Sequence, residues 1–421
     1  MSVLTKTILL TTLILIGLAF VLPMLYKKEI AESIRKAIND NIYGEFRFEE
    51  ANLTLFRNFP SLNLEIHKPE LFSYKNGDTS RIFAANEFVV FLDLWNIISR
   101  KETLRIEGIE LNKPEIALIQ YNDSISNFDI VKETKSEKAQ GEEGFDLDIN
   151  QFNISEGNIA YKDLANGMNV FLTGINQELN GIFRKKDLDI KTRTHVGSLS
   201  LESDGISYLN KAKLDILLDL AVQGEQSKYI IKTGEFSINE LDLLSSGSLA
   251  LSDDGSIQVD VLIRSKETKV KDLFSLIPSS FKGSWDQVSS TGSFKFDGTI
   301  KGQYSDSLAI YPTIKFDLNV NDGSVKYPGM QFSLDQINLD ISAMDMSNKL
   351  DQTTIDIKKF DFSLNNRPFS GKLRATDIQR DFYVAGNING SVSLSDFSKF
   401  MPLEQGTSLE GLIDANLIFD F

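Results

Sequence analysis

Hydrophobic and polar residues alternate with a period of two along most of the chain beyond residue 46. The alternation is clean in residues 61–67 (SLNLEIH) and recurs in 88–94, 104–111 and 115–119. Successive side chains of a β-strand point to opposite faces, so this pattern predicts strands with one apolar and one polar face. The same alternation predicts later strands around residues 145–149, 214–216, 257–261, 293–297, 314–320, 332–334 and 355–357.

The N-terminal segment Ile8–Tyr26 breaks this pattern because it is apolar throughout and carries no charge. At about 1.5 Å per residue a helix of this length spans roughly 28 Å, close to the hydrocarbon core of a bilayer. We therefore expect residues 1–28 to be a transmembrane anchor. A cleaved signal peptide is the alternative, but the run is longer than a signal core and no small-residue cleavage site follows it. The residues that characterise the anchor are Ile8, Leu9, Leu13, Ile16, Phe20, Leu25 and Tyr26.

The next segment, Glu29–Tyr43, has helical spacing. Its apolar stripe consists of Ile30, Ile34, Ala37 or Ile38, and Ile42. Gly44 is a natural stop for this amphipathic helix. Two interpretations remain open: the helix covers the first sheet, or it lies on the bilayer surface.

Residues 132–144 (KETKSEKAQGEEG) lack apolar periodicity, which predicts a solvated linker. We therefore expect an N-terminal helix and β unit at 29–131 and a repetitive β region at 145–421. Eight Asx-Gly pairs, a strong hairpin signal, predict mostly antiparallel neighbours. The pairs begin at Asn76, Asn166, Asn180, Asp204, Asp254, Asp297, Asp322 and Asn389.

Two pairs of segments repeat within the chain. Residues 152–161 match 318–327 in the order apolar, polar, apolar, two residues, Gly, one residue, apolar, one residue, Tyr. Residues 272–278 match 396–402, each starting with Asp and ending with Pro after a pattern typical of one helical turn. Such repeats indicate an array that grows by stacking similar units.

The apolar strand faces need a cover, because few helices are predicted beyond the N-terminus. A second sheet would give stacked sandwiches, whereas a curled sheet would form a trough that contacts apolar ligands such as lipid acyl chains. The residues predicted to line such a groove are Leu62, Leu64, Ile66, Val90, Leu92, Val259, Val261, Phe294, Phe296, Ile314, Phe316, Leu318 and Val320.

Charge and residue chemistry exclude several functions. The net charge is −15, which argues against nucleic-acid binding. There is no cysteine, and His67 and His195 each stand alone in strand-like runs. Nucleophilic triads are therefore not expected, nor are a catalytic site, a metal site or a cofactor. Asp146, Asp148 and Asn150 share a strand face but lack calcium-loop spacing, so we interpret them as a solvated face.

An ordered set of segments gives the chain a family resemblance. After the apolar span and its short helix come residues 53–64, 92–98, 106–116, 127–131 and 154–163. This set resembles the AsmA-like proteins, most strongly over residues 1–165. Such proteins are usually longer, and this chain stops inside an apparent strand, so we expect it to be incomplete at the C-terminus.

The resemblance implies an inner (cytoplasmic) membrane anchor with the bulk of the chain in the periplasm. It also implies a hydrophobic β-groove that passes phospholipid between the inner and outer membranes and supports outer-membrane biogenesis and integrity. The alternative function is a membrane-tethered scaffold or assembly factor, whose partners are outer-membrane or other envelope proteins. Neither function requires catalysis.

Overall fold

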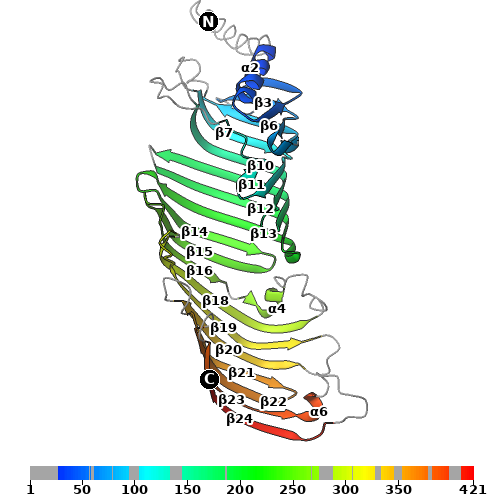
Figure 1. The fold of residues 1–421 in the computed structure, drawn as a ribbon, viewed down its shortest axis with the longest axis vertical. Helices are drawn as coiled ribbons and strands as arrows, with labels where there is room; N and C mark the ends of the chain where they lie inside the picture. Colours follow the sequence, from blue (N-terminus) through cyan, green and yellow to red (C-terminus); the bar gives the residue numbers. More distant parts are fainter. Residues whose placement is uncertain are drawn as a thin grey trace, which may run out of the picture. The chain divides into compact units, whose positions relative to one another are not determined.

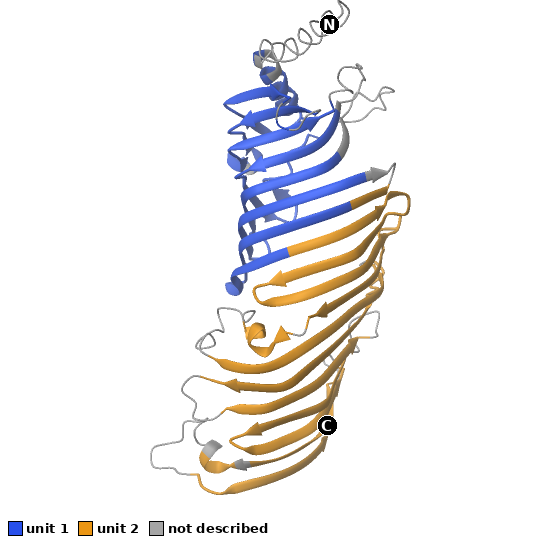
Figure 2. Cartoon of the chain, turned by 180° about the vertical axis from the view of Figure 1, so that it is seen from behind, with its two compact units in different colours: residues 1–185, 190–215 blue, residues 186–189, 216–421 orange. Residues whose placement is uncertain are grey.

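A computed structural model gives the structure of the chain as two compact units (Figure 2). Unit 1 comprises residues 1–185 and 190–215, and unit 2 comprises residues 186–189 and 216–421. The predicted mainly β class is confirmed, with long strands and few helices. The structure describes residues 27–55, 57, 61–77, 79–93, 104–132, 145–184, 187–266, 268–274, 288–305, 307–327, 333–345, 353–377, 382–397 and 409–421.

The described part of unit 1 begins with helix α2, Lys27–Asp40 (Figure 1). The helix ends earlier than predicted, because the side chain of Asn39 joins it to the first strand. Asn39 Oδ1 accepts a hydrogen bond from Phe46 N at 2.6 Å. The predicted anchor, Ile8–Tyr26, lies outside the described residues. Within the part of the chain that is described, no helix is both long and apolar enough to span a membrane.

The first strands of unit 1 pair with one another in antiparallel fashion. β2, β3, β6 and β7 pair in this order, each antiparallel to the next. The 3-10 turn η1 (Lys75–Gly77) joins β4 to β5. The strands are β1 (Gly44–Arg47), β2 (Glu50–Thr54), β3 (Leu62–His67), β4 (Glu70–Ser73), β5 (Ser80–Ala84), β6 (Glu87–Leu92), β7 (Leu104–Asn112), β8 (Glu115–Asn122) and β9 (Ile125–Ser126).

The compact units divide at a different place from the boundary predicted at residues 132–144. The strand after this segment, β10 (Phe145–Asp163), pairs in parallel with both β7 and β8. It then pairs antiparallel with β11 (Met168–Arg184). The strands on both sides of the charged segment therefore belong to unit 1. The division between the units falls instead within β12 (Asp187–Ser203) and β13 (Ile206–Gln223).

Unit 2 is an antiparallel meander in which successive long strands pair, with the short strand β17 beside β18. Its strands are bent along their length (Figure 1). The 3-10 turn η2 (Gly224–Gln226) precedes β14. The strands are β14 (Lys228–Ile238), β15 (Leu241–Leu251), β16 (Ile257–Ser265), β17 (Thr268–Lys269), β18 (Ser289–Tyr304), β19 (Thr313–Lys326), β20 (Leu334–Asp345), β21 (Thr353–Leu364), β22 (Arg367–Thr376), β23 (Tyr383–Ser393) and β24 (Leu412–Asp420).

The Asx-Gly pairs predicted hairpins correctly in only half of the cases. The pairs that begin at Asn76, Asn166, Asp204 and Asp254 lie between strands. Those that begin at Asn180, Asp297, Asp322 and Asn389 lie inside β11, β18, β19 and β23. One unpredicted turn, Asn365-Asn366 between β21 and β22, has φ angles of 49° and 61°. Asparagine tolerates positive φ, so it makes the same kind of turn without glycine.

The first predicted repeat is a repeated β-bulge. In unit 1 the bulge lies at Glu156-Gly157, and Asn176 Oδ1 on the next strand accepts a hydrogen bond from Glu156 N at 3.2 Å. In unit 2 the bulge lies at Asp322-Gly323, and Asn338 Oδ1 accepts one from Asp322 N at 3.1 Å. Both acidic residues have a positive φ, 52° and 46°. Bulges bend a strand and increase its twist, so the repeated motif contributes curvature at equivalent places.

The second predicted repeat gives two short helices, α4 (Val270–Leu273) and α6 (Leu394–Phe397). The repeated aspartate is the third residue of each helix. In α4, Asp272 Oδ2 accepts a hydrogen bond from Lys269 N at 3.2 Å and so caps the first turn. Each helix follows a strand of unit 2 and precedes the next long strand, β18 or β24.

Candidate functional site

The strand register of unit 2 gathers apolar side chains on one face of the sheet. Phe316 on β19 lies opposite Ala343 on β20, which lies opposite Ile355 on β21. Other residues of this face also lie opposite apolar residues on the adjacent strand. The apolar side chains therefore form rows that run across the strands. A second row runs through Leu318, Ile341, Ile357, Leu373 and Gly386. The β-bulges do not disrupt these rows. Each bulge adds an extra residue between two apolar pairs, and the next pair again brings apolar residues opposite each other.

The opposite face of the same strands carries ion pairs between neighbouring positions. Lys301 Nζ lies 3.0 Å from an Asp260 carboxylate oxygen, and Arg264 Nε lies 3.0 Å from one of Asp297. Along β19, Lys315 donates a hydrogen bond to Asp317, which raises the pKa of the lysine. Exposed pairs of this kind contribute about 0–1 kcal/mol each. Their value here is diagnostic, because they identify the solvated face of the sheet.

The apolar face is only half covered by the described protein. Val259, Val261 and Phe316 are partly exposed, and Ile314 is 39% exposed. Among the residues that the structure describes, unit 2 has few buried hydrophobic side chains for so many strands. An apolar surface of this kind gains free energy when an apolar molecule or segment covers it, about 25 cal/mol for each Å².

Helix α4 covers one part of the face. Val270 packs with Leu241, Phe294 and Val320 in a buried cluster, and Leu273 joins them. Phe294 is 2% exposed and Val320 is 7% exposed. Phe296 and Leu318 pack at the border of this cluster. Two of the predicted lining residues, Phe294 and Val320, therefore lie in a closed local core under α4.

The predicted lining residues of unit 1 are covered in the same way by α2. Ile66 is 2% exposed and packs in a core with Phe46 and Phe48. Leu64 lies against this core, together with Ile34 and Ile38 of the helix, whereas Ala37 is exposed.

The amphipathic stripe thus faces the sheet, which confirms the first interpretation of the helix. Val90 is also buried, while Leu62 and Leu92 pair with each other and are half-buried. The predicted residues that remain on an open apolar face of unit 2 are Val259, Val261, Ile314 and Phe316.

Phenylalanine rings on the apolar face lie over glycines of the neighbouring strand. A Cβ on Gly371 would lie 2.5 Å from Phe360 Cζ, and one on Gly390 would lie 2.3 Å from Phe369 Cδ1. These strand glycines therefore leave room for rings that lie flat along the sheet. Sequence reasoning missed this role, although a Phe-rich chain with glycines inside alternating runs is the available signal.

Three hollows in the described part of the chain are lined by none of the predicted groove residues. The first, about 370 Å³, includes Arg57, Glu87 and Glu110 of unit 1. The second, about 690 Å³, is also in unit 1 and is lined largely by charged side chains. The third, about 440 Å³, lies on the polar face of unit 2 beside Asp356 and Arg374. The open apolar face is thus a surface of the sheet and not one of these cavities.

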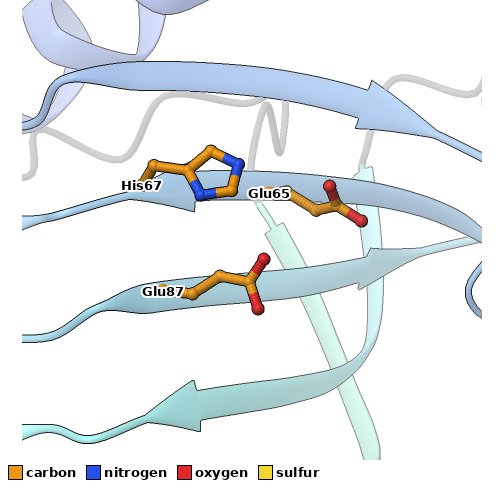
Figure 3. A group of neighbouring side chains, drawn as sticks. All are labelled: Glu65, His67 and Glu87. Carbon is orange, nitrogen blue, oxygen red and sulfur yellow. The ribbon is translucent and has the colours of Figure 1, made fainter.

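The histidines differ from the isolated residues expected from the sequence. His67 lies beside Glu65 on β3 and Glu87 on β6 (Figure 3). Sequence reasoning missed this group because Glu87 is distant in the chain. His195 is exposed and its Nδ1 lies 2.7 Å from Asp215 Oδ1. The acidic pair Asp146 and Asp148 lies in β10, where the side chains are outside the described part of the structure.

Comparison with known proteins adds no identification. No family model, no curated protein and no solved structure matches this chain.

Proposed function

We propose that the chain is a membrane-anchored envelope protein whose apolar sheet face binds lipid acyl chains and passes phospholipid between the inner and outer membranes. The observation that carries the proposal is the one-sided sheet of unit 2. Its register collects Val259, Val261, Ile314 and Phe316 on a half-exposed face, with ion pairs on the other. Phospholipid has the matching chemistry, an apolar chain with a polar end.

The energetics of this surface favour a flexible apolar ligand. Each CH₂ group of an acyl chain that leaves water gains about 0.8 kcal/mol. Rows of apolar side chains cross strands that are spaced about 4.8 Å apart, so an extended chain meets equivalent contacts as it crosses from strand to strand. A surface of repeated, similar contacts has no single preferred position, which suits movement along the sheet better than storage.

The proposal uses the N-terminal segment as the inner-membrane anchor and places the β units in the periplasm. Support for this part comes from the sequence, in which Ile8–Tyr26 is uncharged and long enough to span a bilayer. The proposal includes no catalytic step.

The test uses a photo-reactive amino acid at neighbouring positions with opposite orientation. Val261 and Phe316 report on the apolar face, while Asp260 and Asp317 are matched controls one residue away on the polar face. After irradiation in cells, adducts of the purified chain are identified by mass spectrometry. We expect phospholipid adducts at the first two positions and at most one tenth as many at the controls.

Equal lipid labelling of both faces would contradict the proposal. Protein adducts in place of lipid at Val261 and Phe316 would favour the alternative function, a tethered scaffold or assembly factor for outer-membrane proteins. The two functions are therefore separated by the chemical nature of the adduct, and the polar-face positions control for crosslinker reactivity.

A further inference from the structure

Three potential metal ligands come together on one face of β3 and β6 in unit 1, which also carries the buried side chains of Val89 and Phe91. His67 on β3 lies directly opposite Glu87 on β6 in the antiparallel register. Glu65 is two residues before His67 and therefore projects from the same face of β3. One ligand atom from each of the three residues lies within 4.8 Å of the others (Figure 3).

The donor set is that of a borderline divalent cation. Imidazole nitrogen and carboxylate oxygen are both ligands of Zn²⁺, at about 2.0–2.2 Å. The same set binds the neighbouring first-row divalent ions, with affinity that rises towards Cu²⁺. Three protein ligands on a half-buried surface leave a coordination position that solvent can reach. Small side-chain rotations on two rigid, paired strands would bring the three donors to bonding distance.

In Glu65 and in Glu87, one carboxylate oxygen accepts a hydrogen bond from a neighbouring side chain. Thr54 Oγ1 donates to Glu65 Oε1 at 3.1 Å, and Arg57 donates to Glu87 Oε2 at 2.8 Å. In both cases the second oxygen remains for a cation. Outer partners of this kind orient metal ligands and typically change metal affinity by about 10- to 100-fold. Arg57 also pairs with Glu110, so its charge is shared between two carboxylates.

One buried polar group without a partner lies on the same strand face. Asn63, two residues before Glu65, is completely buried, and its Oδ1 accepts no hydrogen bond from any group in the described structure. Its amide nitrogen lies 3.5 Å from Thr54 Oγ1, the same hydroxyl that holds Glu65. Buried carbonyl oxygens without a partner are rare in folded proteins. The polar hollow of about 370 Å³ is lined by Glu87 and Arg57, so one of the three ligands borders a solvent-filled space.

We propose that Glu65, His67 and Glu87 form a binding site for one divalent transition-metal ion, with Zn²⁺ as the best match. This revises the expectation from the sequence that the chain binds no metal. The site lies in unit 1 and does not depend on the proposed lipid function, so either proposal can fail without the other.

The test measures metal binding to the untagged full-length protein in detergent after removal of metal with a chelator. Co²⁺ is the probe, because its visible absorption reports coordination by nitrogen and oxygen, and Zn²⁺ is then added to displace it. The variants are His67→Ala and Glu87→Gln, and the matched control is His195→Ala, which removes the other histidine–carboxylate pair. Far-UV circular dichroism of each variant verifies the fold.

We expect one equivalent of Co²⁺ to bind the natural chain and the His195→Ala variant, and Zn²⁺ to displace it. The His67→Ala and Glu87→Gln variants should bind at least tenfold more weakly. Absence of saturable binding by the natural chain below about 1 mM Co²⁺, the range of weak surface sites, would overturn the proposal. So would equal binding by all variants, or loss of binding in the His195→Ala variant alone. If the His67→Ala variant does not fold, Co²⁺ binding by the nearly isosteric Glu87→Gln variant tests the proposal instead.

Discussion

The first sheet of unit 1 and the sheet of unit 2 are built from the same alternating pattern but are covered differently. In unit 1 helix α2 closes the apolar face, and Ile66 is 2% exposed. In unit 2 the short helix α4 closes only the region around Phe294, while Ile314 is 39% exposed. Alternation therefore shows that a strand has an apolar face, but the cover decides whether that face is a core or a surface.

The two sheets also share a local device. The bulges at Glu156 and Asp322 are stabilised by Asn176 and Asn338 through the same backbone-to-side-chain hydrogen bond. The shared bulge indicates that both units use one solution for bending a sheet. The two units therefore differ in how their apolar faces are covered, and not in how their strands are bent.

The largest expected difference in the free energy of unfolding comes from an Ile→Ala substitution made once in the covered face of unit 1 and once in the open face of unit 2. Ile66→Ala should lower the free energy of unfolding by about 2–5 kcal/mol, because it leaves a cavity under α2. Ile314→Ala should cost about 1 kcal/mol or less, because the residue is already 39% exposed to water and its truncation leaves no closed cavity. Urea denaturation followed by far-UV circular dichroism measures both. Similar losses in the two variants would mean that the face of unit 2 is as closed as that of unit 1.

A smaller effect tests whether the bulges of the two units are equivalent. Asn176→Ala and Asn338→Ala each remove one hydrogen bond to a bulge amide and should cost about 1 kcal/mol. Hydrogen exchange should show faster exchange of the Glu156 or Asp322 amide respectively. The exposed Asn319, in the middle of β19, provides an Ala control with little expected effect. A loss in only one of the two variants would show that the repeat is a likeness of sequence without a common energetic role.

The smallest expected effect is a dependence on pH and salt. In unit 1, hydrogen bonds from Arg47 and Tyr74 lower the pKa of Glu45 to about 2 from its usual 4.5. The stabilisation is present above pH 4.5 and is lost as the pH falls towards 2. In unit 2, the hydroxyls of Ser324 and Ser333 lower the pKa of Asp335, so its contribution is likewise lost on acidification below its usual value of 3.8.

Salt distinguishes these two carboxylates. Raising the ionic strength should weaken the contribution of Glu45, which has a charged partner, more than that of Asp335, whose two closest partners are neutral. Unfolding curves of the Glu45→Gln and Asp335→Asn variants against pH, at low and high salt, provide the measurement. An equal response of both carboxylates to salt would show that the Arg47 charge is not what stabilises Glu45.

Much of the local structure was predictable because it depends on neighbouring residues. The strands around Leu62–His67 and Ile314–Val320 follow from alternation, and the stripe of α2 follows from helical spacing. Hairpin turns were less predictable. Asn166-Gly167 forms a turn, whereas Asp322-Gly323 forms a bulge inside β19. Both sites need a positive φ, so the dipeptide alone does not distinguish them.

The candidate sites depended still more on the fold. The alternating runs around Val259 and Phe294 look alike in the sequence, yet Phe294 is buried under α4 while Val259 stays half-exposed. His67 and Glu87 are separated by a hairpin and meet only because β3 pairs with β6. In the same way, the parallel pairing of β10 with β7 joins strands on either side of the expected linker.

The sequence by itself determined the mainly β fold class, the strands with one apolar and one polar face, the helix before them and the absence of cysteine chemistry. These properties are set by side chains within a few residues of one another. The tertiary structure alone decided which apolar faces are closed, where the compact units divide and which side chains meet His67. Those outcomes depend on strand register and helix placement over long distances in the chain, and that information is not contained in any local pattern.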